Sequence, residues 1–313
     1  MTDDVVIRPI DPDLDAPQIV ALMRDTSPHV VITIETWRQQ YASISGRARH
    51  AAWVATADGN LVGRGEGRLH RYSKSGSALA GVSIGTAFRG RGIGSRLWER
   101  VEAHLRELNP TRVLTNFIEK PEAVRFAQAR GFVEVRADTL SSVDPNAVNM
   151  SPLDALPPSL RIVPLRDVPP EEIFEIDVAT TADVPLTDSP TDIPFEEWLD
   201  NQWQKPTLTL DGSFAAIENG RVASFTMLTA DLESRRAFTD STGTMRHARG
   251  HGLATAVKLA SLRWAAATGI TSAWTTNDET NAPMLAVNGR LGYRPSARRV
   301  EYVREASGAA TAS

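Results

Sequence analysis

Two short stretches rich in glycine and basic residues have the composition of a phosphate-binding loop. Residues 89–94 read RGRGIG and residues 249–254 read RGHGLA. Each stretch follows a strand-like run and precedes a run with helical periodicity, so its main-chain N–H groups lie at a helix start, where they lack intrahelical partners and the helix dipole adds positive charge. Glycine lets the backbone turn sharply and approach an anion closely. The pattern therefore predicts that a phosphate group binds at one or both helix starts.

The two stretches belong to a longer internal repeat. Landmarks recur in one order at a spacing of 160 or 161 residues: Arg89 with Arg249, Trp37 with Trp198, Thr115-Asn116 with Thr276-Asn277, and Gly131-Phe132 with Gly292-Tyr293. A nearly constant spacing indicates that one fold occurs twice. The recurrence also favours a phosphate site over the alternative interpretation, in which a glycine turn only joins a strand to a helix.

Both repeats have the same expected order of strands and helices. In the first repeat, residues 5–10 are expected to form a strand, residues 19–26 and 34–42 two helices, and residues 51–70 a hairpin across an Asp-Gly-Asn turn. The helix after each glycine stretch is marked by apolar residues at helical spacing: Leu97, Val101, Leu105 and Leu108 in the first repeat, and Leu253, Val257, Ala260 and Trp264 in the second. The remaining segments predict further strands and one more helix in each repeat.

This order predicts an α+β fold, with a mixed, mostly antiparallel sheet flanked by helices, in two tandem copies. The predicted domains are residues 1–140 and residues 160–306. Residues 141–159 contain four prolines and are predicted to be a linker. Residues 307–313 are small or polar and are predicted to be a flexible tail.

The composition restricts the class of protein. A chain of 313 residues with 42% hydrophobic content is long enough for two domains. It has no cysteine, no leader pattern and no apolar run of membrane-spanning length, which predicts a cytoplasmic protein that uses no thiolate chemistry. A net charge of -4 argues against nonspecific nucleic-acid binding. Only four of the 34 basic residues are lysine, a usage associated with GC-rich bacterial genomes.

Two common phosphate-loop motifs do not fit. When the dinucleotide motif G-x-G-x-x-G is aligned from Gly90, Ser95 occupies the position of its third glycine. The nucleotide-binding motif G-x-x-x-x-G-K-[ST] does not occur in the sequence. Both stretches instead resemble the acyl-CoA loop [QR]-x-x-G-x-[GA] of the GNAT N-acetyltransferase superfamily. The second motif of that superfamily, an asparagine followed by a short helix and Gly-Phe or Gly-Tyr, is similar to residues 281–293 and, with lysine in the first place, to residues 120–132. In length and tandem layout the chain is also similar to the mycothiol synthases.

The resemblance implies acetyl-CoA as co-substrate and no metal. It implies that the pyrophosphate lies on one or both glycine stretches, and that pantetheine pairs with the edge of the preceding strand, where a backbone N–H can polarise the thioester carbonyl. The residues implied in the first repeat are Val82, Ser83, Ile84, Arg89, Gly90, Arg91, Gly92, Ile93, Gly94 and Ser95. Those in the second are Thr242, Gly243, Thr244, Arg249, Gly250, His251, Gly252, Leu253, Ala254 and Thr255, with Asn281 and Asn288 from the second motif.

The sequence departs from the superfamily at the catalytic positions. Ala127 and Asn288 stand where many members carry a tyrosine that protonates the departing thiolate, so the proton must come from water or another side chain, or one copy does no chemistry. Asp240 is the candidate base, because it lies two residues before Thr242 and should share its face of the strand. Alternatively, Asp240 caps or solvates a strand end. Its counterpart in the first repeat is Ala80, which favours the second repeat as the catalytic one.

Other polar residues of the first repeat are given no role in the chemistry. Glu66, His70 and Tyr72 lie on or just after the second strand of the hairpin and are interpreted as solvated or satisfied polar residues. The acceptor site is expected around residues 25–45 and 180–205, where nothing in the sequence identifies the acceptor.

Two functions remain open. The first is transfer of an acetyl group from acetyl-CoA to a primary amine of a small molecule, with one catalytic and one degenerate or structural domain. The second is a non-catalytic acyl-CoA sensor or scaffold, which the missing tyrosines favour. In either case we expect a small-molecule partner, no nucleic acid, no membrane, and a monomer or homodimer.

Overall fold

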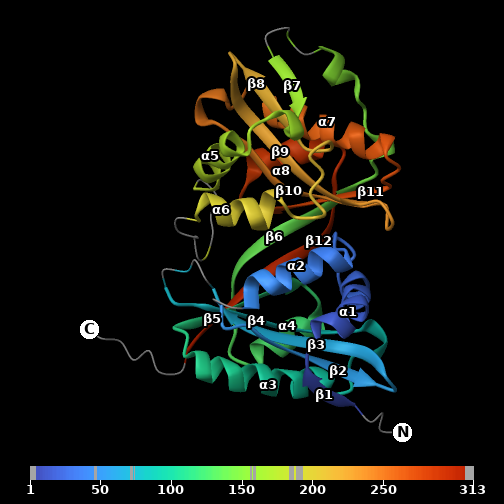
Figure 1. Cartoon of the computed structure of the whole chain (residues 1–313), viewed down its shortest axis with the longest axis vertical. Coiled ribbons are helices and arrows are strands. Elements are labelled where there is room, and N and C mark those ends of the chain that lie inside the picture. The colour runs from blue at the N-terminus through green and yellow to red at the C-terminus, as the bar shows by residue number, and fades with distance from the viewer. Residues whose placement is uncertain are drawn as a thin grey trace, which may run out of the picture. The chain divides into compact units, whose positions relative to one another are not determined.

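The computed structural model describes residues 5–45, 48–70, 73, 75–155, 157, 160–182, 187 and 193–306. It divides into two compact units, coloured from blue to red along the chain in Figure 1. Unit 1 comprises Met1–Ala137, Thr187–Asp192 and Arg299–Ser313, and unit 2 comprises Asp138–Leu186 and Ile193–Arg298. These units differ from the predicted segments 1–140 and 160–306, because the last strand of each repeat contributes to the unit formed by the other repeat.

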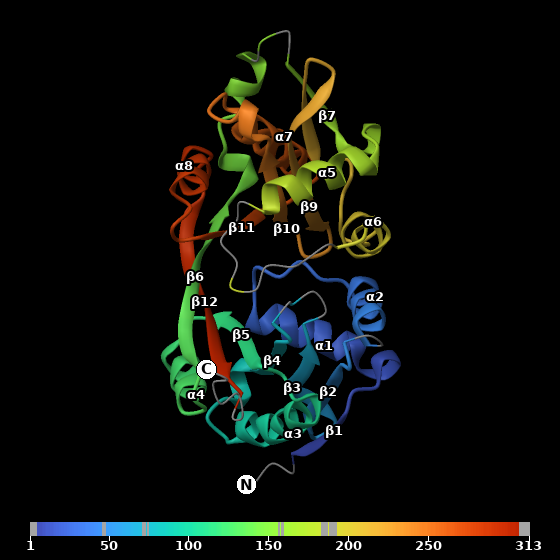
Figure 2. The ribbon, with the colours of Figure 1, turned by 90° about the vertical axis from the view of Figure 1, so that its left-hand side faces the viewer.

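Unit 1 is built on a mixed sheet in the order β1-β2-β3-β4-β5-β12. Its strands are β1 (Val6–Pro9), β2 (Ala51–Ala57), β3 (Asn60–Leu69), β4 (Ala78–Ile84), β5 (Arg112–Ile118) and the C-terminal part of β12 (Arg294–Glu305). Neighbours are antiparallel except β4 and β5, which are parallel. Helices α1 (Pro12–Thr26) and α2 (Ile34–Ser45) lie on one face of this sheet, and α3 (Ile93–Leu108) and α4 (Pro121–Gln128) lie on the other (Figure 2).

Glycines on β3 decide which of its side chains face α3. A Cβ on Gly63 would lie 2.7 Å from Ile84 Cδ1, and one on Gly65 would lie 3.1 Å from Val101 Cγ2. The missing side chains let α3 pack closely, with the predicted stripe Leu97, Val101, Leu105 and Leu108 buried. Because side chains alternate along a strand, the charged residues between the glycines, Arg64, Glu66 and Arg68, face the α1 side.

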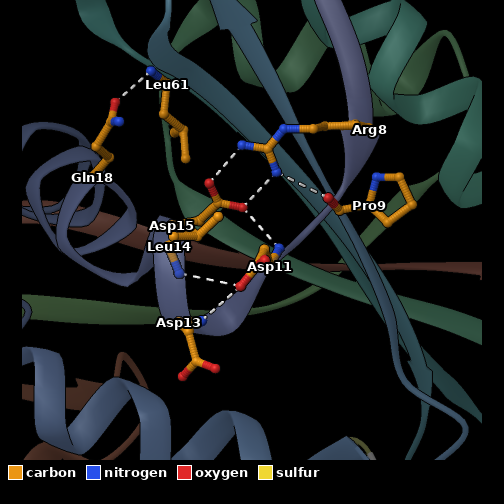
Figure 3. Close-up of polar contacts among 8 residues, drawn as sticks. All are labelled: Arg8, Pro9, Asp11, Asp13, Leu14, Asp15, Gln18 and Leu61. Atoms are coloured by element: carbon orange, nitrogen blue, oxygen red, sulfur yellow. Dashed lines mark hydrogen bonds and ion pairs between the residues drawn. The ribbon is translucent and has the colours of Figure 1, made fainter.

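Helix α1 is fastened to the sheet at both ends. At its N-terminus, Arg8 of β1 donates two hydrogen bonds of 2.7 Å to the Asp15 carboxylate, which also accepts the Asp11 amide at 2.8 Å (Figure 3). Asp11 caps the helix by accepting from two first-turn amides. At the other end, Asp25 accepts the Thr86 amide at 2.9 Å. The C-terminal turn of α1 is therefore held beside the end of β4.

Unit 2 repeats this architecture, with the order β6-β11-β10-β9-β8-β7. Its strands are β7 (Leu160–Pro164), β8 (Phe214–Glu218), β9 (Arg221–Asp231), β10 (Arg236–Thr244), β11 (Ser272–Asp278) and the second part of β6 (Val133–Val143). Among the described strands of this unit, β10 and β11 pair in parallel and the other neighbours are antiparallel. Helices α5 (Pro170–Thr181) and α6 (Phe195–Trp198), continued by a π-helical turn (Leu199–Trp203), cover one face, and α7 (Leu253–Ala267) and α8 (Ala282–Arg290) cover the other. Short 3₁₀ turns lie at Thr86–Phe88, Pro145–Ala147, Ser151–Ala155, Leu165–Asp167 and Arg246–Ala248.

Each unit is completed by a strand from the end of the other repeat. β12 pairs with β5 from Arg299↔Ile118 to Glu305↔Arg112, and β6 pairs with β11 from Asp138↔Asp278 to Val143↔Ala273. In unit 1 the Tyr302 ring lies 5.1 Å from that of Phe117. Arg304 donates to Glu102 at 3.0 Å and lies 4.9 Å from the Phe132 ring. Residues 299–305 are therefore part of the core of unit 1.

The predicted fold class and the two copies are confirmed. Both hairpins form across left-handed turns at Asp58-Gly59 and Asn219-Gly220, as Asp-Gly and Asn-Gly favour. The predicted linker 141–159 begins inside β6, which extends to Val143, and its described part continues in the two 3₁₀ turns there. The predicted tail, residues 307–313, lies outside the described residues. No helix in the described part of the chain is long and apolar enough to cross a membrane.

Candidate functional site

The first glycine stretch forms a turn of open main-chain amides at the start of α3. Gly90 and Gly92 have φ angles of 76° and 77°, a region that glycine adopts without strain. No side chain caps the helix. Within the described part of the chain, no hydrogen bond is formed by the amides of Gly90, Gly92, Ile93 or Gly94. These N–H groups can therefore bind an anion.

The first arginine of each stretch holds the turn in place. Arg89 Nε donates to the Ile84 carbonyl at 3.2 Å, and Arg249 Nε donates to the Thr244 carbonyl at 3.1 Å. The matching bonds tie each loop back to the end of the preceding strand. The sequence resemblance implies that Arg89 and Arg249 belong to the cofactor loops, and the structure adds that their Nε atoms shape these loops.

The parallel strands of unit 1 separate just before the glycine turn. β4 pairs with β5 only at Ala78↔Val113 and Leu79↔Leu114, although both strands are fully described. From Ala80 to Ile84, the β4 edge that faces β5 is thus free of strand partners. An open edge can pair with the amides of an extended ligand, as an added strand would.

A cavity of about 680 Å³ in unit 1 joins the turn to this open edge. Its lining includes predicted cofactor residues of the first repeat: Val82, Ser83, Ile84, Arg89, Gly90, Gly92, Ile93, Gly94 and Ser95. Arg91 is not among the lining residues; its guanidinium donates to the Ala87 carbonyl at 3.1 Å and lies 5.0 Å from the Phe88 ring. Trp98, Phe126 and Phe132 add an aromatic wall. The cavity is of the size of a small-molecule site.

Arg130 adds a cation beside the turn that the sequence analysis misses. Its Nη2 donates to Ser95 Oγ at 3.0 Å, and its guanidinium lies 3.5 Å from the centre of the Phe126 ring. Burial lowers the pKa of Arg130, and the side chain remains a cation. Both Arg130 and Lys120 line the cavity. The signal in the sequence is an arginine directly before Gly131-Phe132, at a position where the second repeat has Leu291.

Glu66 lies at the other end of the cavity. Its carboxylate accepts from His50 Nε2 at 3.1 Å and forms a close ion pair with Arg64. Burial acts to raise the pKa of Glu66, but Arg64, His50 and Arg68 together bring it well below its usual range. Glu66 is thus a satisfied carboxylate, as expected, but the structure places it in the cavity wall. His70 does not line the cavity, and Tyr72 lies outside the described residues.

Unit 2 has the same turn, with Gly250 and Gly252 at φ angles of 82° and 80° and an uncapped α7. The polar groups around it differ from those in unit 1. Asn281, expected to bind cofactor, caps α8 by accepting the Met284 amide at 3.2 Å. Asn288 is buried and donates to Asn277 Oδ1 at 2.6 Å. The side chains of Asn281 and Asn288 thus make structural contacts.

Asp240 does not share a face with Thr242, so that step of the sequence argument is wrong. A bulge between Thr239 and Ser241 breaks the alternation of side chains along β10. Asp240 forms an ion pair with Lys205 at 2.7 Å, whereas Thr242 is hydrogen-bonded to Thr226 Oγ1 on the opposite face. The ion pair occupies the carboxylate, which weakens the case for Asp240 as a base.

Helix α5 lies close against β10 on the face that corresponds to the α1 face of unit 1. A Cβ on Gly243 would lie 2.3 Å from Thr180 Oγ1 and 2.6 Å from a ring atom of Phe225. The Asp177 carboxylate, whose pKa is raised by burial, accepts from Ser241 Oγ and from Trp198 Nε1, each at 2.9 Å. The matching position in unit 1 is Ser83, which has a side chain and lines the cavity.

The second repeat also places a lysine where the first has the aromatic wall. Lys258 on α7 corresponds to Trp98 on α3. It is 2% exposed, and its ammonium lies 5.2 Å from the centre of the Tyr293 ring. Burial lowers the pKa of Lys258 to about 7. Unit 2 therefore buries an amine where unit 1 buries an indole.

In unit 1, the parallel strands of a mixed sheet separate beside a helix start with open amides, an arrangement that suits an extended phosphorylated ligand. The model of the Acetyltransferase (GNAT) family matches residues 17–132 and 172–293, which is more than half of the chain. The protein therefore belongs to the GNAT family, whose members are acyl-CoA-dependent acetyltransferases.

Solved structures support the tandem fold. A tandem GNAT protein from the clavulanic acid biosynthesis pathway is 20% identical, with a TM-score of 0.74 over 98% of this chain and 100% of that one. A GCN5-related N-acetyltransferase from Sphaerobacter thermophilus is 18% identical, with a TM-score of 0.68 over 97% and 96% of the two chains. Saccharomyces cerevisiae N-myristoyltransferase with bound myristoyl-CoA is 11% identical, with a TM-score of 0.62 over 97% and 78%. At these identities the likeness concerns the fold. No curated protein sequence matches the chain.

Proposed function

We propose that the protein transfers an acetyl group from acetyl-CoA to a primary amine of a small molecule, and that unit 1 carries out the transfer. The observation that carries the proposal is the cavity of unit 1, which joins an open glycine turn, an unpaired strand edge and the half-buried carboxylate of Glu66. The set of polar groups in unit 2 is less suited, because Asp240 is ion-paired and α5 lies close against β10.

In this proposal the residues of unit 1 divide acetyl-CoA between them. The amides of residues 90–94 and the cations Arg130 and Lys120 bind the phosphates, and the β4 edge from Ala80 to Ile84 pairs with pantetheine. The amine nitrogen, once deprotonated, forms a bond with the acetyl carbonyl carbon as the C–S bond breaks. The amine proton goes to solvent, and water protonates the CoA thiolate, since Ala127 offers no proton.

Unit 2 is proposed as the degenerate copy. It keeps the turn and the strand order, but α5 packs so closely on β10 that a Cβ on Gly243 would lie 2.3 Å from Thr180 Oγ1, whereas the matching Ser83 of unit 1 lines the cavity. Binding stoichiometry tests this assignment. Calorimetry with acetyl-CoA should give one site per chain.

Two matched loop variants identify the unit that binds. Gly92→Glu should weaken binding by at least about tenfold, because a carboxylate would stand among amides that hold a phosphate, whereas Gly252→Glu should leave the affinity unchanged. The reverse pattern, or two equivalent sites, would contradict the assignment to unit 1.

A non-catalytic acyl-CoA sensor is the second candidate function. It is favoured by Ala127, which is buried where many family members have a proton-donating tyrosine. Release of free CoA thiol across a panel of primary amines separates the two functions. Release that depends on an amine supports the transferase, and tight acetyl-CoA binding without release for any amine supports the sensor.

A further inference from the structure

Three charged residues of β3 lie along the acceptor end of the cavity in unit 1. In the β3–β4 register, Arg64 is opposite Ser83, Glu66 is opposite Gly81, and Arg68 is opposite Leu79. All three line the cavity. Because the intervening glycines face α3, these side chains project from the α1 face of the sheet.

The register places Glu66 beside the point where the open edge of β4 ends. The edge begins next to the glycine turn at Ile84 and closes where Leu79 pairs with Leu114. A ligand that enters from the turn and pairs with this edge must therefore end near Ala80 and Gly81. Glu66 is opposite Gly81, where a Cβ would meet only Thr115 Oγ1, at 3.9 Å. Among the described residues, the position above Gly81 is therefore uncrowded.

Glu66 has the properties of a subsite for an ammonium group. Its side chain is 35% exposed although it lines an interior cavity, so part of the carboxylate is available to a ligand. His50 and Arg64 fix its two oxygens, and each oxygen keeps further capacity to accept a hydrogen bond. A held carboxylate of this kind orients an amine by a charge-assisted hydrogen bond.

The part of the cavity wall around Glu66 carries a net positive charge, which is unfavourable for an acceptor whose only charged group is an ammonium. Two guanidinium groups, from Arg64 and Arg68, flank the single carboxylate of Glu66. Arg64 is engaged in the ion pair that holds Glu66. Arg68 follows Glu66 by two positions, about 7 Å along the strand, on the side away from the glycine turn. The charge of Arg68 contributes to the low pKa of Glu66, and its guanidinium can also bind a carboxylate or a phosphate through two parallel N–H groups.

We propose that the acceptor is a primary amine that also carries an anionic oxygen group, with its ammonium bound by Glu66 and its carboxylate or phosphate bound by Arg68. This inference rests on the proposed function and adds the chemical class of its acceptor. Thr26 and Ser27 at the C-terminal end of α1 also line the cavity and suit a small polar molecule. Glu66 acts in binding and orientation, since its carboxyl is too acidic to serve as a base at neutral pH.

Matched pairs of amines test the inference. Acceptors are compared as an α-amino acid against its amide and its decarboxylated amine, and as phosphoethanolamine against ethanolamine, with CoA release as the readout. We expect kcat/KM to be at least about tenfold higher for the anionic member of at least one pair. Whether the amino-acid set or the phosphoethanolamine pair shows this preference identifies the anionic group as a carboxylate or a phosphate. Equal or reversed values in both sets would overturn the inference while leaving the transferase in place. No release with any amine, despite acetyl-CoA binding, would overturn the proposed function itself.

Variants at Arg68 and Glu66 separate recognition from folding. Arg68→Leu should abolish the preference for the anionic member, mainly through KM, whereas Arg68→Lys should retain most of it because the charge is kept. Glu66→Gln should raise KM for every amine. All three should bind acetyl-CoA as the wild type does, since the glycine turn lies at the other end of the cavity. An Arg68→Leu enzyme that keeps its preference while binding acetyl-CoA normally would refute the assignment.

Discussion

Replacing Lys258 with methionine tests whether unit 2 buries an uncompensated amine. Lys258 is 2% exposed, and burial lowers its pKa from 10.5 to about 7. Since a pKa unit corresponds to about 1.4 kcal/mol, the shift disfavours the folded state by roughly 4 kcal/mol at pH 7. Methionine has a similar length and no charge. We therefore expect Lys258→Met to raise the free energy of unfolding at pH 7 by about 1–4 kcal/mol, the lower figure allowing for a lost contact with Tyr293.

The stability difference between the wild type and Lys258→Met should depend on pH in a defined direction. Between pH 7 and pH 10.5 the unfolded lysine binds a proton that the folded lysine has lost, so the stability contributed by this site rises with pH across that range. The difference between wild type and Lys258→Met should therefore shrink as the pH rises, and urea unfolding at pH 7, 8, 9 and 10 measures it. A variant that is less stable at pH 7, or a difference that stays constant up to pH 10, would refute the reasoning.

Three further predictions concern the turn, the acceptor face and the first helix. Arg130→Gln should raise the Kd for acetyl-CoA about tenfold by removing a cation beside the turn, whereas Arg125→Gln, on the exposed side of α4, should leave it unchanged in calorimetry. Gly243→Ala should lower the free energy of unfolding by about 1–3 kcal/mol, because its Cβ would lie 2.3 Å from Thr180 Oγ1. Acetyl-CoA binding should persist in this variant, and its loss would contradict the assignment of binding to unit 1. The Arg8 ion pair lowers the pKa of Asp15, so its contribution is complete above the ordinary carboxyl pKa and is lost as acid protonates it. Asp15→Asn should therefore unfold more readily at pH 7 and show a flatter loss of stability below about pH 4 in thermal melts; an unchanged acid limb would contradict this.

Local patterns carry most of what the sequence predicts correctly. The apolar stripe of α3, the Asp-Gly turn of the first hairpin and the two glycine stretches depend on neighbours within a few residues, and each lies where expected. The internal repeat extends this local information to the architecture of both copies, because the second occurrence confirms the first.

The features that the sequence does not reveal are those that depend on distant partners. The bulge at Asp240 reverses the face of that carboxylate, and a single strand sequence does not specify a bulge. Glu66 and Arg130 belong to the cavity through contacts with His50 and Ser95, which are 16 and 35 residues away along the chain. The exchange of β6 and β12 is likewise invisible, since each strand has the same alternating pattern whichever sheet it joins.

The exchange of the last strands, β6 and β12, affects how the chain folds during its synthesis on the ribosome. Tyr302 and Arg304 pack on Phe117 and Phe132, so the wall of unit 1 includes residues that are translated after nearly all of unit 2. A nascent chain that has emerged only as far as residue 298 cannot finish its N-terminal sheet, whereas most multidomain chains fold their first domain while the rest is being made. Until synthesis reaches β12, the β5 edge is exposed to other strands, and this is the interval in which a chaperone would matter most.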